Sequence, residues 1–214
     1  MADAPRCRLY LTTPPELVSG GVRLRDFLQR FEPALAAADT ACLLIDAPGD
    51  ARDEMVEEIA RPLNEIAQAR GIATLLSARA TLAQRIGTDG LHLDLRILDE
   101  AAALRTYRDA RKTLGADAIL GALCPAGRHL AMEIAELDAD YVGFDLAAGE
   151  TPEIVGWWAE MMNTPCVAFG VVEPAQAQAL ADSGADFIAV SASLWQAPDP
   201  ARQLERIQTA IRSG

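Results

Sequence analysis

The sequence predicts a single-domain α/β fold, a (β/α)8 barrel of the TIM type, over residues 1–214, and a repeated phrase is the main reason. The phrase is a Gly, a small residue and an Asp, followed by a short apolar run. It starts at Gly87, Gly115, Asp138 (with Asp in place of Gly) and Gly184. A Gly after a helical pattern suits a left-handed helix C-cap, and a short apolar run is typical of a strand covered on both faces. A recurring unit of one strand plus one helix indicates a βα architecture.

The length of the chain supports the same fold class. The 214 residues are half hydrophobic, which is enough for one sizeable core, and a β/α barrel of this length forms one domain. A doubly wound open sheet is the alternative fold. Its dinucleotide-binding versions carry Gly-x-Gly-x-x-Gly after the first strand, and this chain does not. The sequence therefore favours the barrel.

The first half of the chain alternates strand-like runs with helical patterns. Apolar residues recur at helical spacing from Leu24 to Leu35 and again from Met55 to Ala67, whereas Ala41-Cys-Leu-Leu-Ile45 is a continuous apolar run. Pro62 lies inside the second helical pattern and predicts a kink or a break there. The expected elements are a strand at 8–12, a helix at 24–39, a strand at 41–45, a helix at 55–67, a strand at 72–76, a helix at 78–86 and a strand at 90–93.

The second half repeats this alternation four more times. Its first helix has Asp99 and Glu100 early and Arg111 and Lys112 late, an order that suits the helix dipole. The expected elements are a helix at 98–114, a strand at 118–123, a helix at 128–137, a strand at 141–144, a helix at 152–162, a strand at 165–169, a helix at 174–183, a strand at 187–190 and a helix at 200–211.

Composition restricts the partners. The net charge is −12 and the pI about 4.6, so nucleic acid and anionic membranes are not expected partners, and a small-molecule ligand is. The first residues form no apolar signal segment, and no stretch approaches a membrane span. The sequence has four cysteines without metal-binding spacing: Cys7, Cys42, Cys124 and Cys166. Three of them lie in or at the end of strand-like runs, which is typical of reduced thiols and favours the cytoplasm.

In the helix at 152–162, Trp157-Trp158 places at least one indole outward, as a packing or oligomer surface.

A barrel of this kind carries its chemistry at the carboxyl ends of the strands. Asp46, Asp94 and Asp145 follow the second, fourth and sixth strands, and alternate strands direct side chains into the same layer of a barrel. Three converging carboxylates without a basic partner would bind a divalent cation, an amine or another organic cation. The alternative is that each Asp caps the following helix or lies at a solvated rim.

Other polar residues fall at the same edge. His92 and Asp94 lie two residues apart on one face of a strand and are the catalytic candidates, although a hydrogen-bonded core histidine is the alternative for His92. Cys124 before Pro125 is a nucleophile candidate without a clearly placed base. Gly170, Ser191 and Ser193 could form a backbone phosphate site after the last two strands, but Glu173 would repel an anion.

Several motifs in register resemble the thiamine phosphate synthase superfamily, which includes the thiazole tautomerase branch. Gly87-Thr-Asp-Gly-Leu-His-Leu resembles the family's Gly-Ala-Asp-Gly-Val-His-Leu-Gly-Gln, and Pro165-Cys-Val-Ala-Phe-Gly resembles its Pro-Val-Val-Ala-Ile-Gly-Gly. Gly184-Ala-Asp-Phe-Ile-Ala-Val-Ser resembles its Gly-Ala-Asp-Gly-Val-Ala-Val-Val-Ser. The resemblance implies a barrel fold. For a working synthase it also implies magnesium-dependent joining of hydroxymethylpyrimidine diphosphate to thiazole phosphate, with release of pyrophosphate.

The chain departs from the family pattern where that chemistry takes place. The Arg and Lys of the family's Gln-Leu-Arg-x-Lys are Leu44 and Asp46, and its Asn-Asp after the third strand is Ser77-Ala78, where Arg79 is the neighbouring cation. The Pro-Thr-x-Thr-Lys loop is absent after the sixth strand. A diphosphate leaving group needs compensating cations in the transition state, which a mouth with three carboxylates does not supply.

The sequence thus predicts a divergent member of this family with a degenerate site that binds a small ligand through Asp46, Arg79, Asp94, Asp145, Gly170, Ser191 and Ser193. Magnesium held by Asp46, Asp94 and Asp145 is the candidate cofactor. Two alternatives stay open: an active thiamine-phosphate synthase, and a non-catalytic interaction protein that uses the acidic surface and the tryptophan pair. A homo-oligomer is compatible with all three hypotheses.

Overall fold

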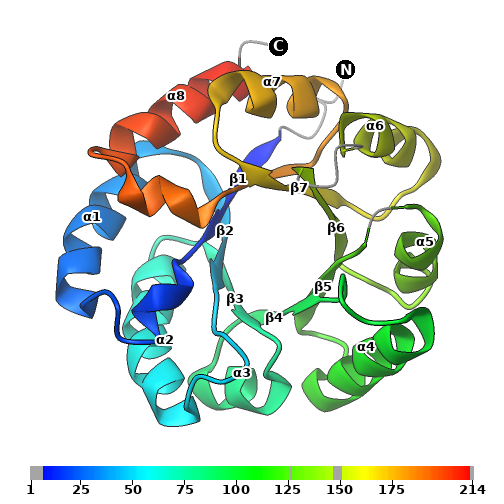
Figure 1. The fold of residues 1–214 in the computed structure, drawn as a ribbon, viewed down its shortest axis with the longest axis horizontal. Helices are drawn as coiled ribbons and strands as arrows, with labels where there is room; N and C mark the ends of the chain where they lie inside the picture. The colour runs from blue at the N-terminus through cyan, green and yellow to red at the C-terminus, as the bar shows by residue number, and fades with distance from the viewer. Residues whose placement is uncertain (1–6, 126, 147–150, 213–214) are drawn as a thin grey trace.

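The computed structural model describes residues 7–125, 127–146 and 151–212 and shows a closed parallel barrel surrounded by helices (Figure 1). The strands are β1 (Arg8–Thr12), β2 (Thr40–Ile45), β3 (Ala73–Ser77), β4 (Gly90–Asp94), β5 (Ile119–Leu123), β6 (Tyr141–Asp145), β7 (Cys166–Val171) and β8 (Phe187–Val190). The helices are η1 (Pro15–Leu17), α1 (Leu24–Ala37), α2 (Asp53–Gln68), α3 (Ala80–Ile86), α4 (Glu100–Leu114), α5 (His129–Ala135), α6 (Thr151–Met161), α7 (Pro174–Asp182), η3 (Ala192–Gln196) and α8 (Pro200–Arg212).

The predicted (β/α)8 barrel is confirmed. Each strand pairs in parallel with its neighbour in the sequence, and β8 pairs with β1 to close the sheet, with Arg8 opposite Phe187 and Leu11 opposite Val190. Every expected helix and strand is present, with ends that differ by at most two residues. Two short 3-10 helices, η1 and η3, were not expected. None of the described helices is long and apolar enough to cross a membrane.

The apolar residues form two cores, as the alternation of side chains along a strand requires. The larger core lies between the strands and the outer helices and contains side chains such as Leu43, Phe31 and Trp158. The smaller core lies inside the barrel and contains Tyr10, Leu75, Leu123, Tyr141 and Phe169, among others. The inward-facing side chains line the barrel from one end to the other, so any site at either end of the barrel is built from them.

The repeated phrase has a defined structural role. Its first residue has a positive φ in every copy, of +83°, +88°, +57° and +100° at Gly87, Gly115, Asp138 and Gly184. In three copies the Asp, which stands just before one strand, accepts a hydrogen bond from the start of the preceding strand in the sequence. Asp89 Oδ2 accepts the backbone N–H of Thr74 at 2.7 Å, and the same bond runs from Leu120 to Asp140 at 2.7 Å and from Cys166 to Asp186 at 2.8 Å. The repeat therefore ties neighbouring strands together at the amino end of the barrel.

Replacing Asp89 with alanine is expected to lower the free energy of unfolding by roughly 1–3 kcal/mol, because a charged acceptor is lost and a backbone N–H is left without its partner. Asp89 Oδ2 also accepts from Thr74 Oγ1 at 3.0 Å and Gln68 Nε2 at 3.1 Å. The matched control is Asp117→Ala, because Asp117 holds the same place in its copy and is exposed. Urea unfolding of both variants measures the difference. Equal losses would contradict the strand-tying role.

Two local expectations have clear outcomes. Of the kink or break predicted at Pro62, the break is wrong, because α2 runs without interruption from Asp53 to Gln68. Its buried face, which includes Val56, Ile59, Leu63 and Ala67, packs along the whole helix and outweighs one missing backbone hydrogen bond. Of the two tryptophans in α6, Trp158 points inward and is 1% exposed, whereas Trp157 is partly buried under the guanidinium of Arg128.

Candidate functional site

The three predicted carboxylates lie at the carboxyl end of the barrel, which is called the mouth below. Asp94 and Asp145 are the last residues of β4 and β6, and Asp46 follows β2 directly. Because the strands are parallel, all three lie at the same edge of the sheet. The Asp94 side chain is 46% exposed and that of Asp145 18% exposed.

Arg96 joins two of these carboxylates, and the expectation that they lack a basic partner is wrong. Its guanidinium donates from Nη2 to Asp94 Oδ2 at 2.7 Å and from Nε to Asp94 Oδ1 at 2.9 Å, and Nη1 forms an ion pair with Asp145. The arrangement is a carboxylate–guanidinium–carboxylate triad that spans β4 and β6. Arg96 stands two residues after Asp94 in the sequence, which is the signal that could have identified it.

These contacts shift the pKa values in opposite directions within the triad. The hydrogen bonds that Arg96 donates to Asp94 raise the pKa of Arg96. Partial burial raises the pKa of Asp94, but its bonds to Arg96 outweigh that effect, and the net change is downward. Both groups are therefore charged at neutral pH, and the positive charge of Arg96 is already committed to two carboxylates.

Asp46 is more buried than Asp94 and has a different environment. Its backbone N–H donates to the buried Thr13 Oγ1 at 3.0 Å, and the next residue, Ala47, donates its N–H to Ser77 Oγ at 2.7 Å. Burial raises the pKa of Asp46 and Asp94 raises it further, while a hydrogen bond from Ser77 acts in the opposite direction. A carboxylate in this setting is stabilised by a cation or a hydrogen-bond donor brought in by a ligand.

The arrangement does not fit a resident magnesium ion. Within residues 7–125, 127–146 and 151–212, no group of three or more His, Cys, Asp or Glu side chains is placed to hold a metal. Magnesium requires oxygen ligands in near-octahedral geometry. Here the oxygens of Asp94 and Asp145 are turned toward Arg96 instead, and a guanidinium between two carboxylates excludes a cation from that position.

His92 lies inside the barrel below the mouth and is 4% exposed. Its Nδ1 is 2.6 Å from the hydroxyl of Tyr141, which in turn is 2.9 Å from the hydroxyl of Tyr10. Burial lowers the pKa of His92 to about 4, so the ring is neutral at pH 7. Of the two catalytic candidates, His92 thus bonds to Tyr141 and Asp94 to Arg96. Sequence reasoning did not single out Tyr10 or Tyr141 for this inner layer, although the alternation of β1 places Tyr10 there.

Two further candidates are held in other roles. Arg79 donates to Asp53 at 2.6 Å and to the carbonyl oxygens of Pro48 at 2.7 Å and Gly49 at 3.1 Å, so it stabilises the loop after β2. Cys124 is 2% exposed, and burial raises the pKa of its thiol to about 12. A protonated, enclosed thiol does not act as a nucleophile.

The residues expected to form a phosphate site lie at the ends of the last two strands. Gly170 is left-handed, with φ of +86°, and a Cβ built there would lie 3.3 Å from Asp145 Oδ1. Ser191 Oγ accepts from the backbone N–H of Ser193 at 3.3 Å and contacts its hydroxyl at 3.1 Å. Glu173 accepts from the first turn of α7 in a capping box with Gln176, so a carboxylate already occupies that helix N-terminus. Gly170 and Asp145 are brought together, and the two serines bond to each other.

The fold and the mouth define a (β/α)8 barrel with a polar, carboxylate-rich site at the carboxyl ends of its strands. The family model described as thiamine monophosphate synthase matches residues 9–194. The chain therefore belongs to the thiamine monophosphate synthase family, as the sequence motifs predicted.

Individual relatives agree with this assignment. The chain is 40% identical over 205 residues to a thiamine-phosphate synthase of Rhodospirillum centenum, covering 90% of this chain and 91% of the relative. It is 35% identical over 206 residues to a thiamine-phosphate synthase of Erythrobacter litoralis, with 91% of each chain covered. Among solved structures, a thiamine phosphate pyrophosphorylase from Pyrococcus furiosus superposes with a TM-score of 0.75 at 19% identity, over 98% of this chain and 97% of the other. The superposition on the Pyrococcus furiosus structure supports the fold alone.

Proposed function

We propose that the mouth binds a small organic cation and that the chain is a divergent family member without synthase activity. The observation that carries this proposal is the Asp94–Arg96–Asp145 triad. A diphosphate requires cations that are free to meet developing negative charge. Arg96 is already bonded to two carboxylates, and Arg79 to Asp53 and two backbone carbonyls.

The sign of the charge supports a cationic ligand. The mouth has three carboxylates, and the guanidinium of Arg96 is paired with two of them, those of Asp94 and Asp145. Glu16 adds to the negative potential that raises the pKa of Asp46. An organic cation that enters here gains attraction from all three carboxylates and relieves the repulsion between Asp46 and Asp94. Thiamine itself is a suitable probe because its thiazolium ring is positively charged and it carries no phosphate.

An active thiamine-phosphate synthase is the second candidate. It is favoured by the 40% identity to a relative of that name over nine-tenths of both chains. Under this candidate, Arg96 and Arg79 leave their carboxylates when substrate binds and contact the diphosphate. The two candidates assign opposite roles to Arg96, and one variant separates them.

If the mouth binds an organic cation, Arg96→Gln is expected to strengthen thiamine binding by roughly fivefold, because a compensating positive charge is removed from beside Asp94 and Asp145. Thiamine phosphate should bind about tenfold more weakly than thiamine, since its phosphate meets the same carboxylates. Calorimetry with both ligands measures these ratios. Arg105→Gln is the matched control, because Arg105 is exposed on α4 and its removal should change neither affinity.

A second experiment addresses the synthase candidate directly. Hydroxymethylpyrimidine diphosphate and thiazole phosphate are titrated with and without magnesium, and thiamine phosphate formation is assayed. Magnesium-dependent binding with product formation, both lost in Arg96→Gln, would establish the synthase and refute the cation proposal. No binding of either phosphate substrate, together with binding of thiamine, would support the proposal of a divergent family member without synthase activity.

A further inference from the structure

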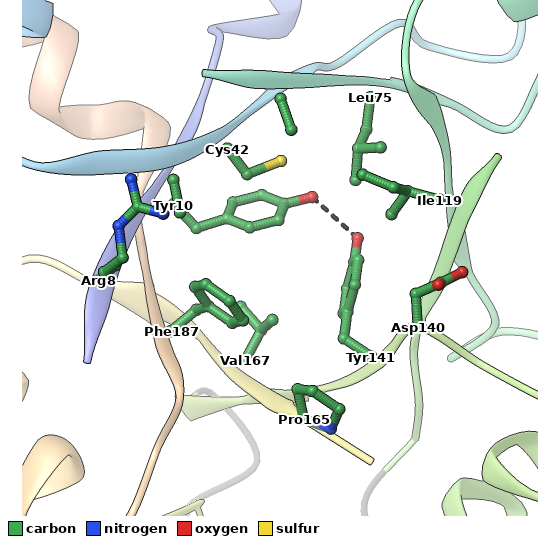
Figure 2. Close-up of a pocket in the computed structure, with 12 residues that line it drawn as sticks. Arg8, Tyr10, Cys42, Leu75, Ile119, Asp140, Tyr141, Pro165, Val167 and Phe187 are labelled. Carbon is green, nitrogen blue, oxygen red and sulfur yellow. Dashed lines mark hydrogen bonds between the residues drawn. The ribbon is translucent and has the colours of Figure 1, made fainter. Parts of the chain in front are cut away.

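A cavity opens at the end of the barrel opposite the mouth. Its volume is about 330 Å³, and it is lined mainly by side chains from the amino ends of the strands (Figure 2). The cause lies in the sequence. Cys42 and Ala73 are register partners on β2 and β3, next to Tyr10 on β1, and their short side chains leave this inner layer unfilled. In a typical barrel, layers of bulky side chains fill this space.

The middle of the cavity is apolar and neutral. Leu75, Ile119, Val167 and Phe187 surround it, as Figure 2 shows. The charged groups at the rim are bonded elsewhere. Arg8 donates to Asp39 at 3.0 Å and to the carbonyl oxygen of Thr40 at 3.2 Å. Asp140 accepts from Arg111 at 2.8 Å and from the backbone N–H of Leu120 at 2.7 Å. Among the described residues that line the cavity, a ligand therefore meets no free charge.

One polar feature enters this apolar space. The hydroxyls of Tyr10 and Tyr141 face each other across it, 2.9 Å apart (Figure 2). Tyr141 continues to His92 Nδ1 at 2.6 Å, so both of its hydrogen-bonding directions are used. Tyr10 ends this series of hydrogen bonds, and the side chain next to it is the thiol of Cys42, its register partner on β2. A thiol is a weak hydrogen-bonding group, and a hydroxyl of a ligand would replace it with a stronger bond.

The free end at Tyr10 can act in either direction. If neutral His92 accepts from Tyr141, Tyr10 donates to Tyr141 and its oxygen is left to accept from a ligand. In the other tautomer the order reverses, and Tyr10 donates to the ligand. Burial and the neighbouring Tyr141 raise the pKa of Tyr10 well above its ordinary value, so the phenol stays protonated at physiological pH. The chain of three groups thus suits one neutral polar group on an otherwise apolar molecule.

We propose that this cavity is a second ligand site, separate from the mouth, for a small neutral aromatic molecule with one hydroxyl that bonds to Tyr10. Benzene fits an apolar cavity of about 150 Å³, so a cavity of about 330 Å³ admits two fused rings. The probes are 2-naphthol and naphthalene, which differ only in the hydroxyl. Wild-type protein is expected to bind 2-naphthol about fivefold more tightly than naphthalene.

Two variants test the placement by calorimetry. Tyr10→Phe should remove the preference for 2-naphthol and leave naphthalene binding unchanged. Ala73→Leu should fill the cavity and abolish binding of both ligands, while Ala101→Leu, on the exposed face of α4, should bind as the wild type does. Thermal unfolding checks that each variant folds, and Tyr10→Phe decides the question if Ala73→Leu does not. Absence of binding to wild type, binding that persists in folded Ala73→Leu, or a preference unchanged in Tyr10→Phe would overturn the proposal.

Discussion

Gly90→Ala is expected to destabilise the barrel by at least about 3 kcal/mol, at the upper end of the range for overpacked cores. A Cβ built at Gly90 would lie 1.8 Å from the carbonyl oxygen and 2.6 Å from the carbonyl carbon of Ile119. Gly90 and Ile119 are register partners in β4 and β5. The clash is with backbone, so no rotamer change relieves it, and the two strands must separate locally.

The comparison for this prediction is Gly49→Ala. A Cβ at Gly49 would meet nothing within 4 Å, and its φ lies outside the left-handed region. Its substitution should change the free energy of unfolding by no more than about 0.5 kcal/mol. Urea unfolding of both variants gives the difference. A loss below about 1 kcal/mol in Gly90→Ala would show that β4 and β5 tolerate a wider separation than their register indicates.

Trp158→Ala is expected to cost about 3–5 kcal/mol. The indole is 1% exposed and packs edge-to-face on Phe144, with ring centroids 5.4 Å apart. Its Nε1–H donates to the carbonyl oxygen of Thr164 at 2.7 Å, and that bond fixes the turn into β7. The variant loses both the buried area and the donor, and leaves a cavity between α6 and the sheet.

Trp157→Ala is the matched control on the adjacent residue. Trp157 is partly buried, and its ring faces Arg128 at 4.3 Å, so the expected loss is about 1–2 kcal/mol. Thermal unfolding ranks the two variants. Equal losses would mean that α6 is anchored by its outer face as strongly as by its inner face.

The fold could be predicted from the sequence because its signals are local and repeated. A residue with positive φ followed by a small residue and an Asp marks the end of a helix and the start of a strand, and the structure gives the Asp a hydrogen-bonding role in three copies. Pro62 shows the limit of local rules, since the buried face of α2 decides the outcome there. The backbone preference of one residue is small beside the burial of a whole helical face.

The site was predictable in position but not in pairing. Strand ends placed Asp46, Asp94 and Asp145 at the mouth correctly. The bond between Arg96 and Asp145 joins two strands that are not sequence neighbours, and its formation depends on side-chain rotamers that no spacing rule contains. The inner contact between Tyr10 and Tyr141 spans 131 positions for the same reason. Sequence patterns assign residues to a face, whereas partners across the barrel follow from its closure.

The seam between β1 and β8 has a consequence for how this chain forms during synthesis. Seven of the eight strand pairings join consecutive strands, but the last joins Leu9 to Ile188. Trp195 Nε1 reinforces it with a 2.7 Å bond to the carbonyl oxygen of Thr12. Until β8 leaves the ribosome, β1 and β7 are open edges with unpaired backbone groups, which favour association with other chains. Closure is thus a late step of high contact order, and the nascent chain stays prone to aggregation until β8 is made, which falls within the final fifth or so of its length.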